Sequence, residues 1–269
     1  MPRTIQRFGW KPDLPDHRDQ FFSASRDVMQ SLPPKFDLTV EDPCINFPIY
    51  DQKQVGSCTA NALAAAVQFD RRKAGQNPDF VPSRLFLYYN ERTIEHSVAN
   101  DSGASLRDGM KTLQKTGICP EADWPYDGTP AEYDGGPFPV GAKAATRPTQ
   151  KAYDDAANYT ITSYQALQQS LSQLQAALVS GFPFAFGFSV YESWTRNDAT
   201  VIPMPSDAES QMGGHAVLAV GYDNQTALFK FRNSWGDLVG EDGYFYIPYA
   251  YVLDRKRAGD FWVINGMKD

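Results

Sequence analysis

Residues that favour helices lie mainly in the first half of this chain, and residues that favour strands lie mainly in the second. Residues 58–73 are rich in Ala and Leu, end in basic residues and are followed by Gly75, the pattern of a helix and its stop. Further helices are predicted at about 84–94, with Ser83 as N-cap, and at about 104–115. The first half is therefore predicted to be mainly helical.

The second half carries short aromatic and β-branched runs that are typical of strands. These runs occupy 184–190, 215–222, 228–233 and 243–247. One more helix is predicted at about 172–180, and residues 127–150, rich in Gly, Pro and Ala, are interpreted as a long loop or linker. The pattern predicts an α+β protein whose second half is mainly antiparallel β structure.

Composition argues against several functional classes. The net charge is -7 and the basic residues form no cluster, so nucleic acid is not expected as a partner. No apolar run approaches the ~20 residues that cross a bilayer, so no membrane partner is expected. The three cysteines and three histidines include no pair with metal-ligand spacing, and we expect neither a metal nor a cofactor.

The N-terminus is polar and lacks the apolar core of a secretory signal. A cytoplasmic protein and one exported by another route, or trimmed of its signal, both remain open. Residues 1–31 are interpreted as an extended arm rather than a folded domain.

Cys58 is a candidate nucleophile because it stands at the start of the predicted helix. The positive end of the helix dipole favours a thiolate there, and Gly56 permits a tight turn and close approach of a substrate. Taken alone, however, Cys58 fits better as a buried structural cysteine, which is the commoner fate of a cysteine.

His215 and Asn233 change that assessment. His215 follows Gly213 and Gly214 at the start of an apolar strand, and Asn233 ends a later strand. A side-chain amide can hold an imidazole in the tautomer that catalysis requires. Each residue alone also fits a structural role, His215 as a core histidine and Asn233 as a turn residue.

The motifs together resemble those of the papain family of cysteine peptidases. They are Gln52 with Gly56-Ser57-Cys58, then Gly214-His215-Ala216, then Asn233-Ser234-Trp235-Gly236, then Gly240-Glu241-Asp242-Gly243-Tyr244. The resemblance extends from about Leu32 to the C-terminus, and its order of motifs is far more specific than any single one.

The resemblance implies a fold and a set of roles. The fold would be papain-like and two-domain, with a helical domain, an antiparallel β-barrel-like domain and the active-site cleft between them. Cys58 would attack the scissile carbonyl of a protein or peptide substrate, His215 would transfer protons and Asn233 would orient His215. Gln52 and the Cys58 N–H would form the oxyanion hole, and Trp235 would shield the His–Asn contact. The Cys58–His215 pair would lower the pKa of the thiol well below its usual ~8.5.

The chain departs from the family pattern at several points. Val55 replaces the usual disulfide cysteine and Thr59 the usual Trp, and the spacing from Cys58 to His215 is longer than usual. We assign the excess to loops within 127–150 or 196–213. These features indicate a divergent, bacterial-type branch.

The expected domain limits are an N-terminal arm at 1–31 and a catalytic domain at 32–269. Within the latter we expect a mainly helical part at about 44–140, a mainly β part at about 141–254, and a C-terminal segment that returns to the body. Substrate-binding positions are predicted at Ser102, Gly103, Gly213 and Gly214, with Ala216 beside them. Ser102 fits a helix cap equally well, and the glycines fit ordinary loop positions equally well.

The same motifs leave other questions open. An acyltransferase or transglutaminase can use the same three side chains, and a catalytically silent binding protein can keep the fold.

Cys44 and Cys119 are either a disulfide or two buried thiols. The arm carries the aromatic residues Phe8, Trp10, Phe21 and Phe22, so we expect it to dock, either near the cleft, where it limits substrate access, or on a remote face as a stabilising strap.

Overall fold

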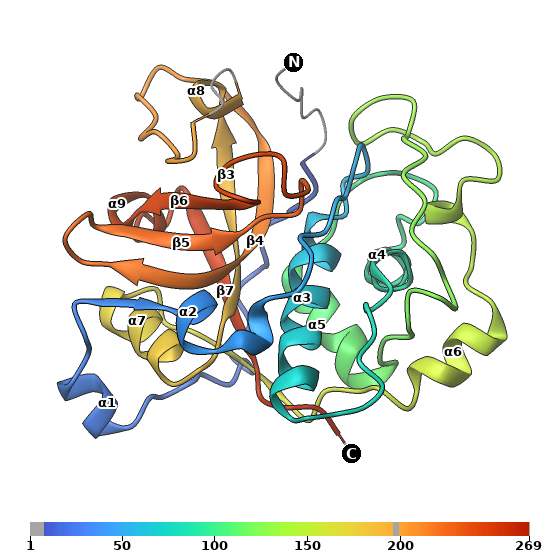
Figure 1. Cartoon of the computed structure of the whole chain (residues 1–269). Helices are drawn as coiled ribbons and strands as arrows, with labels where there is room; N and C mark the ends of the chain where they lie inside the picture. Colours follow the sequence, from blue (N-terminus) through green and yellow to red (C-terminus); the bar gives the residue numbers. More distant parts are fainter. Residues whose placement is uncertain (1–7, 196–198, 269) are drawn as a thin grey trace.

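A helical half and an antiparallel sheet pack against each other in a computed structural model that describes residues 8–195 and 199–268. Figure 1 shows the sheet on the left, the helices α4, α5 and α6 on the right, and helix α3 between them. The helices are α1 (Arg26–Gln30), α2 (Leu38–Glu41), α3 (Cys58–Lys73), α4 (Arg84–Ile94), α5 (Leu106–Lys115), α6 (Gln150–Ala156), α7 (Leu171–Val179), α8 (Glu192–Thr195) and α9 (Tyr249–Val252), with short 3₁₀ turns at Pro43–Ile45 and Lys143–Ala145.

Local sequence signals account for the main helices. The predicted bounds of α3 and α4 are confirmed, and the Ser83 hydroxyl accepts a hydrogen bond from the Phe86 N–H as the predicted N-cap. Helix α5 begins at Leu106 with Ser105 as its cap, slightly later than predicted. These ends are set by side chains within one turn of the helix, which is why the sequence predicts them.

The strands form one antiparallel sheet. They are β1 (Lys35–Asp37), β2 (Tyr164–Ala166), β3 (Phe184–Tyr191), β4 (Gln211–Asp223), β5 (Leu228–Arg232), β6 (Tyr244–Pro248) and β7 (Ala258–Ile264). Their order is β2-β7-β3-β4-β5-β6, and β1 pairs with β4 off this path. The C-terminal segment, which we expected only to return to the body, thus supplies an internal strand.

The sheet is open rather than barrel-like, which corrects one part of the expected fold. In the described part of the chain, β2 and β6 end the strand order and do not pair with each other. Other segments cover these edges: Phe21 bridges to Ala166 of β2, and Val201 bridges to Tyr246 of β6. Edge backbone groups that already pair with these segments are not free to pair with each other and close a barrel.

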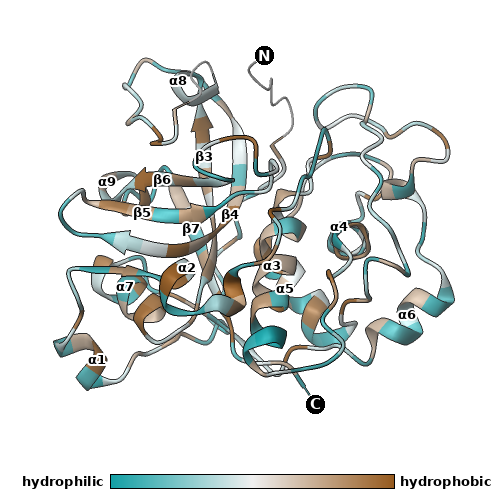
Figure 2. Cartoon of the chain, in the orientation of Figure 1, coloured by the Kyte–Doolittle hydropathy of each residue, from teal (hydrophilic) through white to brown (hydrophobic). Residues whose placement is uncertain are grey.

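The core runs continuously from the helices into the sheet. Helix α3 is buried over most of its length and contacts β3, β4 and β7. Figure 2 shows apolar residues in brown on α2, α3 and α7, and hydrophilic residues in teal at the outer end of α6. Because α3 belongs to both halves of this core, its first residue is placed between them.

The N-terminal arm runs back along the body. Its residues 8–11 pass between the two halves, and Phe22 then donates its backbone N–H to Ala166 O at 2.9 Å and packs on Phe182 with ring centroids 5.4 Å apart. The arm is thus docked, as its aromatic residues predicted, and it reaches both the sheet edge and the space between the halves.

Candidate active site

Cys58 is the first residue of α3 and is fully buried. The Ala-rich sequence that follows builds the helix, so the thiol stands at the positive end of its dipole. Backbone N–H groups of Ala216, Gly9 and Thr59 lie within hydrogen-bonding reach of the sulfur. Because Ala216 follows His215 on β4, the sheet brings the histidine's strand against the thiol.

His215 is fully buried in β4, and its Nε2 atom lies 2.8 Å from Asn233 Oδ1. Asn233 follows β5, and its Oδ1 also accepts the Ser234 N–H at 2.9 Å, which fixes the amide. Nε2 therefore carries the proton in the neutral ring, and Nδ1 has no hydrogen-bond partner among the described residues.

An aromatic wall covers the His215–Asn233 contact. Trp235 stacks on His215 with ring centroids 4.9 Å apart, and Trp194 stacks on Trp235 at the same separation. Phe188, paired with His215 across β3 and β4, meets the imidazole edge-on at 5.8 Å. Trp235 lies where the sequence analysis expected a shield, whereas Trp194 and Phe188 were not anticipated.

Gln52 is fully buried in the turn before α3. Its Oε1 accepts a hydrogen bond from the Ser234 hydroxyl at 2.6 Å, and its Nε2 donates to Val55 O at 2.9 Å. The backbone N–H of Gln52 also donates to Ser234 O at 2.8 Å. The turn is therefore tied to the segment after β5, which keeps the amide next to the start of α3.

Asp101 is a positioning residue for this turn that sequence reasoning missed. Both of its carboxylate oxygens lie 3.0 Å from the Gly56 N, and Oδ1 also accepts from the Tyr88 hydroxyl at 2.7 Å. It precedes Ser102 and Gly103, two of the predicted substrate-binding positions. Nothing in the sequence around Asp101 indicates that its carboxylate accepts the N–H of Gly56, 45 positions away.

The arm crosses these residues in extended form. Trp10 donates its backbone N–H to Gly214 O at 2.8 Å, and Gly9 O accepts from the Ala104 N–H at 2.7 Å. A side chain at Gly9 would place its Cβ 1.5 Å from Gly56 O, so only glycine fits beside the thiol. Phe8 meets His215 edge-on, with ring centroids 6.2 Å apart.

The residues predicted to bind substrate surround this stretch of the arm. A Cβ on Gly103, Gly213 or Gly214 would lie 2.2 to 2.7 Å from Gly9, Phe8 or Trp10 respectively. Ser102 instead donates to Ser97 Oγ at 2.9 Å and lies 3.2 Å from the Lys11 ammonium. The three glycines thus lie against the arm, and Ser102 contacts Lys11 of the arm.

The charge states of Cys58 and His215 follow from their burial. Burial raises the pKa of the Cys58 thiol to about 12 and lowers the pKa of the His215 imidazole to about 4. The lowered Cys58 pKa that the resemblance implied is wrong for this arm-covered form, because exclusion of water outweighs the nearby N–H donors. Both groups are neutral at pH 7 in this form.

Three further features were looked for in the described residues: a disulfide, a metal site and a membrane-spanning helix. Cys44, Cys58 and Cys119 are all free thiols, so the possible Cys44–Cys119 bridge is not formed. No group of three His, Cys, Asp or Glu side chains within residues 8–195 and 199–268 could hold a metal ion. None of the described helices is long and apolar enough to span a membrane.

Comparison with known proteins gives consistent matches over most of the chain. Residues 32–252 match the model for papain family cysteine proteases. An uncharacterized peptidase C1-like protein of Acanthamoeba polyphaga mimivirus is 38% identical, with 99% of this chain and 89% of that protein covered. A cathepsin B-like protein of Giardia intestinalis is 27% identical over 80% of this chain and 68% of its own length.

Among solved structures, xylellain, a cysteine protease from Xylella fastidiosa, is 49% identical to this chain. The two superpose with a TM-score of 0.93, covering 100% of this chain and 99% of the other. A procathepsin B of Trypanosoma congolense superposes with a TM-score of 0.70 at 18% identity, covering 98% and 87%. The second likeness concerns the fold alone.

Proposed function

The chain belongs to the papain family of cysteine proteases, and from this premise we propose that it is an endopeptidase that cleaves peptide bonds through Cys58, His215 and Asn233. The observation that carries the proposal is the 2.8 Å contact between His215 Nε2 and Asn233 Oδ1, which leaves Nδ1 without a hydrogen-bond partner among the described residues. An imidazole held in this tautomer can accept a proton at Nδ1.

The proposed reaction has two halves. Cys58 Sγ attacks the scissile carbonyl carbon while its proton passes to His215 Nδ1, which then protonates the leaving amine as the C–N bond breaks. The product is a thioester on Cys58, and water, deprotonated by His215, hydrolyses it to release the acid and restore the thiol. Asn233 keeps the ring oriented through both halves.

The oxyanion of each tetrahedral intermediate would be stabilised by Gln52 Nε2 and the Cys58 N–H. The first N–H groups of a helix lack acceptors within the helix, so the Cys58 N–H suits this role. The amide of Gln52 is held by its contacts with Ser234 and Val55. A donor of this kind is worth about 10²–10³ in kcat.

We also propose that the N-terminal arm gates this site. The arm places Gly9 beside the thiol, Phe8 beside His215 and Trp10 beside Gly214. A substrate backbone at Cys58 would compete with the arm for the hydrogen-bonding groups of Gly214 and Ala104. Opening of the arm would also readmit water, which favours the thiolate–imidazolium pair that the covered form disfavours.

Alanine substitution of Cys58 tests the catalytic assignment. We expect Cys58→Ala to abolish hydrolysis of peptide amides and labelling by an epoxide thiol inhibitor, with mass spectrometry locating the label on Cys58 in the wild type. Cys44→Ala and Cys119→Ala serve as matched controls and should keep activity. Full activity in Cys58→Ala would refute the assignment.

A further inference from the structure

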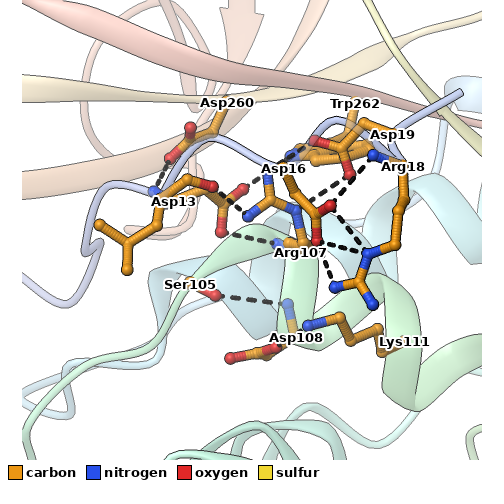
Figure 3. Close-up of polar contacts among 11 residues, drawn as sticks. Asp13, Asp16, Arg18, Asp19, Ser105, Arg107, Asp108, Lys111, Asp260 and Trp262 are labelled. Atoms are coloured by element: carbon orange, nitrogen blue, oxygen red, sulfur yellow. Dashed lines mark hydrogen bonds and ion pairs between the residues drawn. The ribbon is translucent and has the colours of Figure 1, made fainter. Parts of the chain in front are cut away.

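Two acidic residues are joined by a hydrogen bond where the arm leaves the space between the two halves. Asp13 belongs to the arm and Asp260 to β7, and Asp260 Oδ2 accepts the Asp13 N–H at 2.8 Å and the Trp10 indole N–H at 2.9 Å. The Trp262 indole in turn donates to Asp13 Oδ2 at 3.0 Å. Figure 3 shows Asp13 between Asp260 and Arg107. These contacts join the residue that fills the cleft, Trp10, directly to the carboxylate pair.

The cation in this cluster is already engaged by a third carboxylate. Arg107 of α5 donates to Asp19 through Nε at 3.2 Å and Nη2 at 2.7 Å, and through Nη1 to Leu14 O at 2.6 Å. Only the backbone N–H of Arg107 reaches Asp13, at 3.3 Å from Oδ1. One guanidinium thus faces Asp13, Asp19 and Asp260, and the Asp13–Asp260 pair lacks a cation of its own.

The other charged groups around the pair are engaged elsewhere or open to water. Asp16 pairs with Arg18 at 2.6 Å, and Asp108 pairs with Lys111 at 2.8 Å. Arg257, which lines a pocket of about 350 Å³ beside Asp13 and Asp260, pairs with Asp254 at 2.6 Å. Three further groups complete the surroundings: Arg255 and Lys256 in the wall of that pocket, both exposed, and the phenol of Tyr164, packed on Trp262.

We propose that Asp13 and Asp260 form a proton-operated latch on the arm: the docked arm keeps a proton on the pair, and loss of that proton as the pH rises towards neutral loosens the arm from the cleft. This inference rests on the proposed gating of Cys58. The physical reason is that two carboxylates, removed from water and without their own cation, cannot both ionise cheaply at close range.

The direction of the pH effect follows from the two states of the arm. Burial, and then the neighbouring Asp260 carboxylate, raises the pKa of Asp13 to about 7 in the docked form, and burial raises the pKa of Asp260 as well. In a released arm Asp13 returns to the usual ~3.9. The contribution to docking is therefore complete below about pH 4 and is lost as the pH rises through about 7, with a slope of up to about tenfold per pH unit for one proton.

Substitution of Asp13 by asparagine tests the latch in the full chain. An amide keeps the hydrogen bonds but cannot ionise, so Asp13→Asn should hold the arm docked at neutral pH. We would measure labelling of Cys58 by iodoacetamide, located by mass spectrometry, from pH 5 to 7.5. Ionisation of the thiol affects both proteins equally, so it cancels in the ratio of the wild-type rate to the Asp13→Asn rate.

This ratio should rise from pH 5 by up to about tenfold per pH unit and level off above about pH 7. Asp16→Asn, which removes a half-buried carboxylate of the same arm that pairs with Arg18, is the matched control and should behave as the wild type. Asp260→Asn provides a second variant, because asparagine tolerates the positive φ of 57° at this position. A ratio independent of pH, or faster labelling of both amide variants than of the wild type at pH 7.5, would overturn the latch.

Hydrogen exchange of the arm separates failure of the latch from failure of the proposed activity. The Trp10 and Lys11 amides bond to Gly214 O and Ala104 O, so their protection reports docking without any use of Cys58. Protection in the wild type should fall relative to Asp13→Asn as the pH rises. If it does so in a protein that hydrolyses no peptide, the latch stands and only the peptidase proposal fails; if it does not, the latch is wrong whatever the activity.

Discussion

Glycines of the sheet leave the space that the arm occupies. Gly187 of β3 faces the arm, and a Cβ built on it would lie 1.9 Å from Trp10 Cε2, with its three nearest heavy atoms all in the indole. Its register partner across the sheet is Gly259, where a Cβ would meet nothing within 4 Å. The two glycines therefore offer the same substitution with and without contact to the arm.

We expect Gly187→Ala to displace Trp10 and speed the reaction of Cys58 with iodoacetamide. Overpacking costs about 1–3 kcal/mol, which corresponds to roughly 5- to 150-fold in the opening of the arm. Gly259→Ala should leave the labelling rate unchanged, because its methyl group enters open space. Equal rates in both variants would show that Trp10 does not limit access to the thiol.

Among the elements, the arm occupies both of the locations that the sequence left open. Residues 8–11 lie between the two halves, whereas Phe21 bridges to Ala166 of β2 and Phe22 packs on Phe182. Phe21 is 55% exposed, whereas Trp10 is buried and Phe8 and Phe22 are partly buried, and each of these three stabilises docking by up to about 1.5–3 kcal/mol. Removal of the arm is thus expected to affect both access to Cys58 and the stability of the body.

Deletion of residues 1–31 distinguishes a gate from a strap. A gate predicts a lower KM for a peptide substrate and faster labelling of Cys58 in the truncated protein. A strap predicts unchanged kinetics per folded molecule and a lower Tm, which a thermal melt would measure alongside the folded fraction. Unchanged labelling together with a lower Tm would end the gating proposal.

The helices and strands were not equally predictable. The ends of α3 and α4 depend on residues within one turn, and the sequence predicted them closely. Strands β3, β4, β5 and β6 were predicted from their aromatic and β-branched runs, although β4 starts earlier, at Gln211. The internal strand β7 was missed because nothing local shows that it inserts between β2 and β3.

At the level of the whole molecule, buried acids make stability depend on pH. Asp70 of α3 has a buried Oδ2 without a hydrogen-bond partner among the described residues, and the Gly266 N–H near the C-terminus contacts the carboxyl. Burial raises the pKa of Asp70 to about 7. Because the folded-state pKa is raised, the contribution to stability is complete below about pH 4 and is lost as the pH rises through about 7.

Asp70→Asn should therefore gain stability relative to the wild type as the pH rises. The difference in the free energy of unfolding between the two proteins is expected to grow by roughly 2 kcal/mol from pH 5 to pH 8. Urea unfolding at both pH values measures it, with the exposed Glu132→Gln as the control. A difference that stays constant between the two pH values would contradict the assignment.

Chain order and residue type selected the members of the candidate site, which stay a prediction. Gln52, Cys58, His215 and Asn233 were selected from motifs whose order is specific, and the structure brings His215 and Asn233 into contact at 2.8 Å. Their proposed chemical roles still depend on the experiments above. The charge state of Cys58 and His215 was not predictable, because it depends on water exclusion by an arm that lies far away in the sequence.

Local sequence thus specified the helix ends, most strands and the candidate catalytic residues, since caps, turn residues and motifs act over a few neighbouring positions. Tertiary structure alone specified the open sheet, the insertion of β7, the path of the arm and the meeting of Asp13 with Asp260. Those features depend on contacts between residues up to about 250 positions apart. Such contacts are selected by packing and desolvation of the whole chain, which no short stretch of sequence encodes.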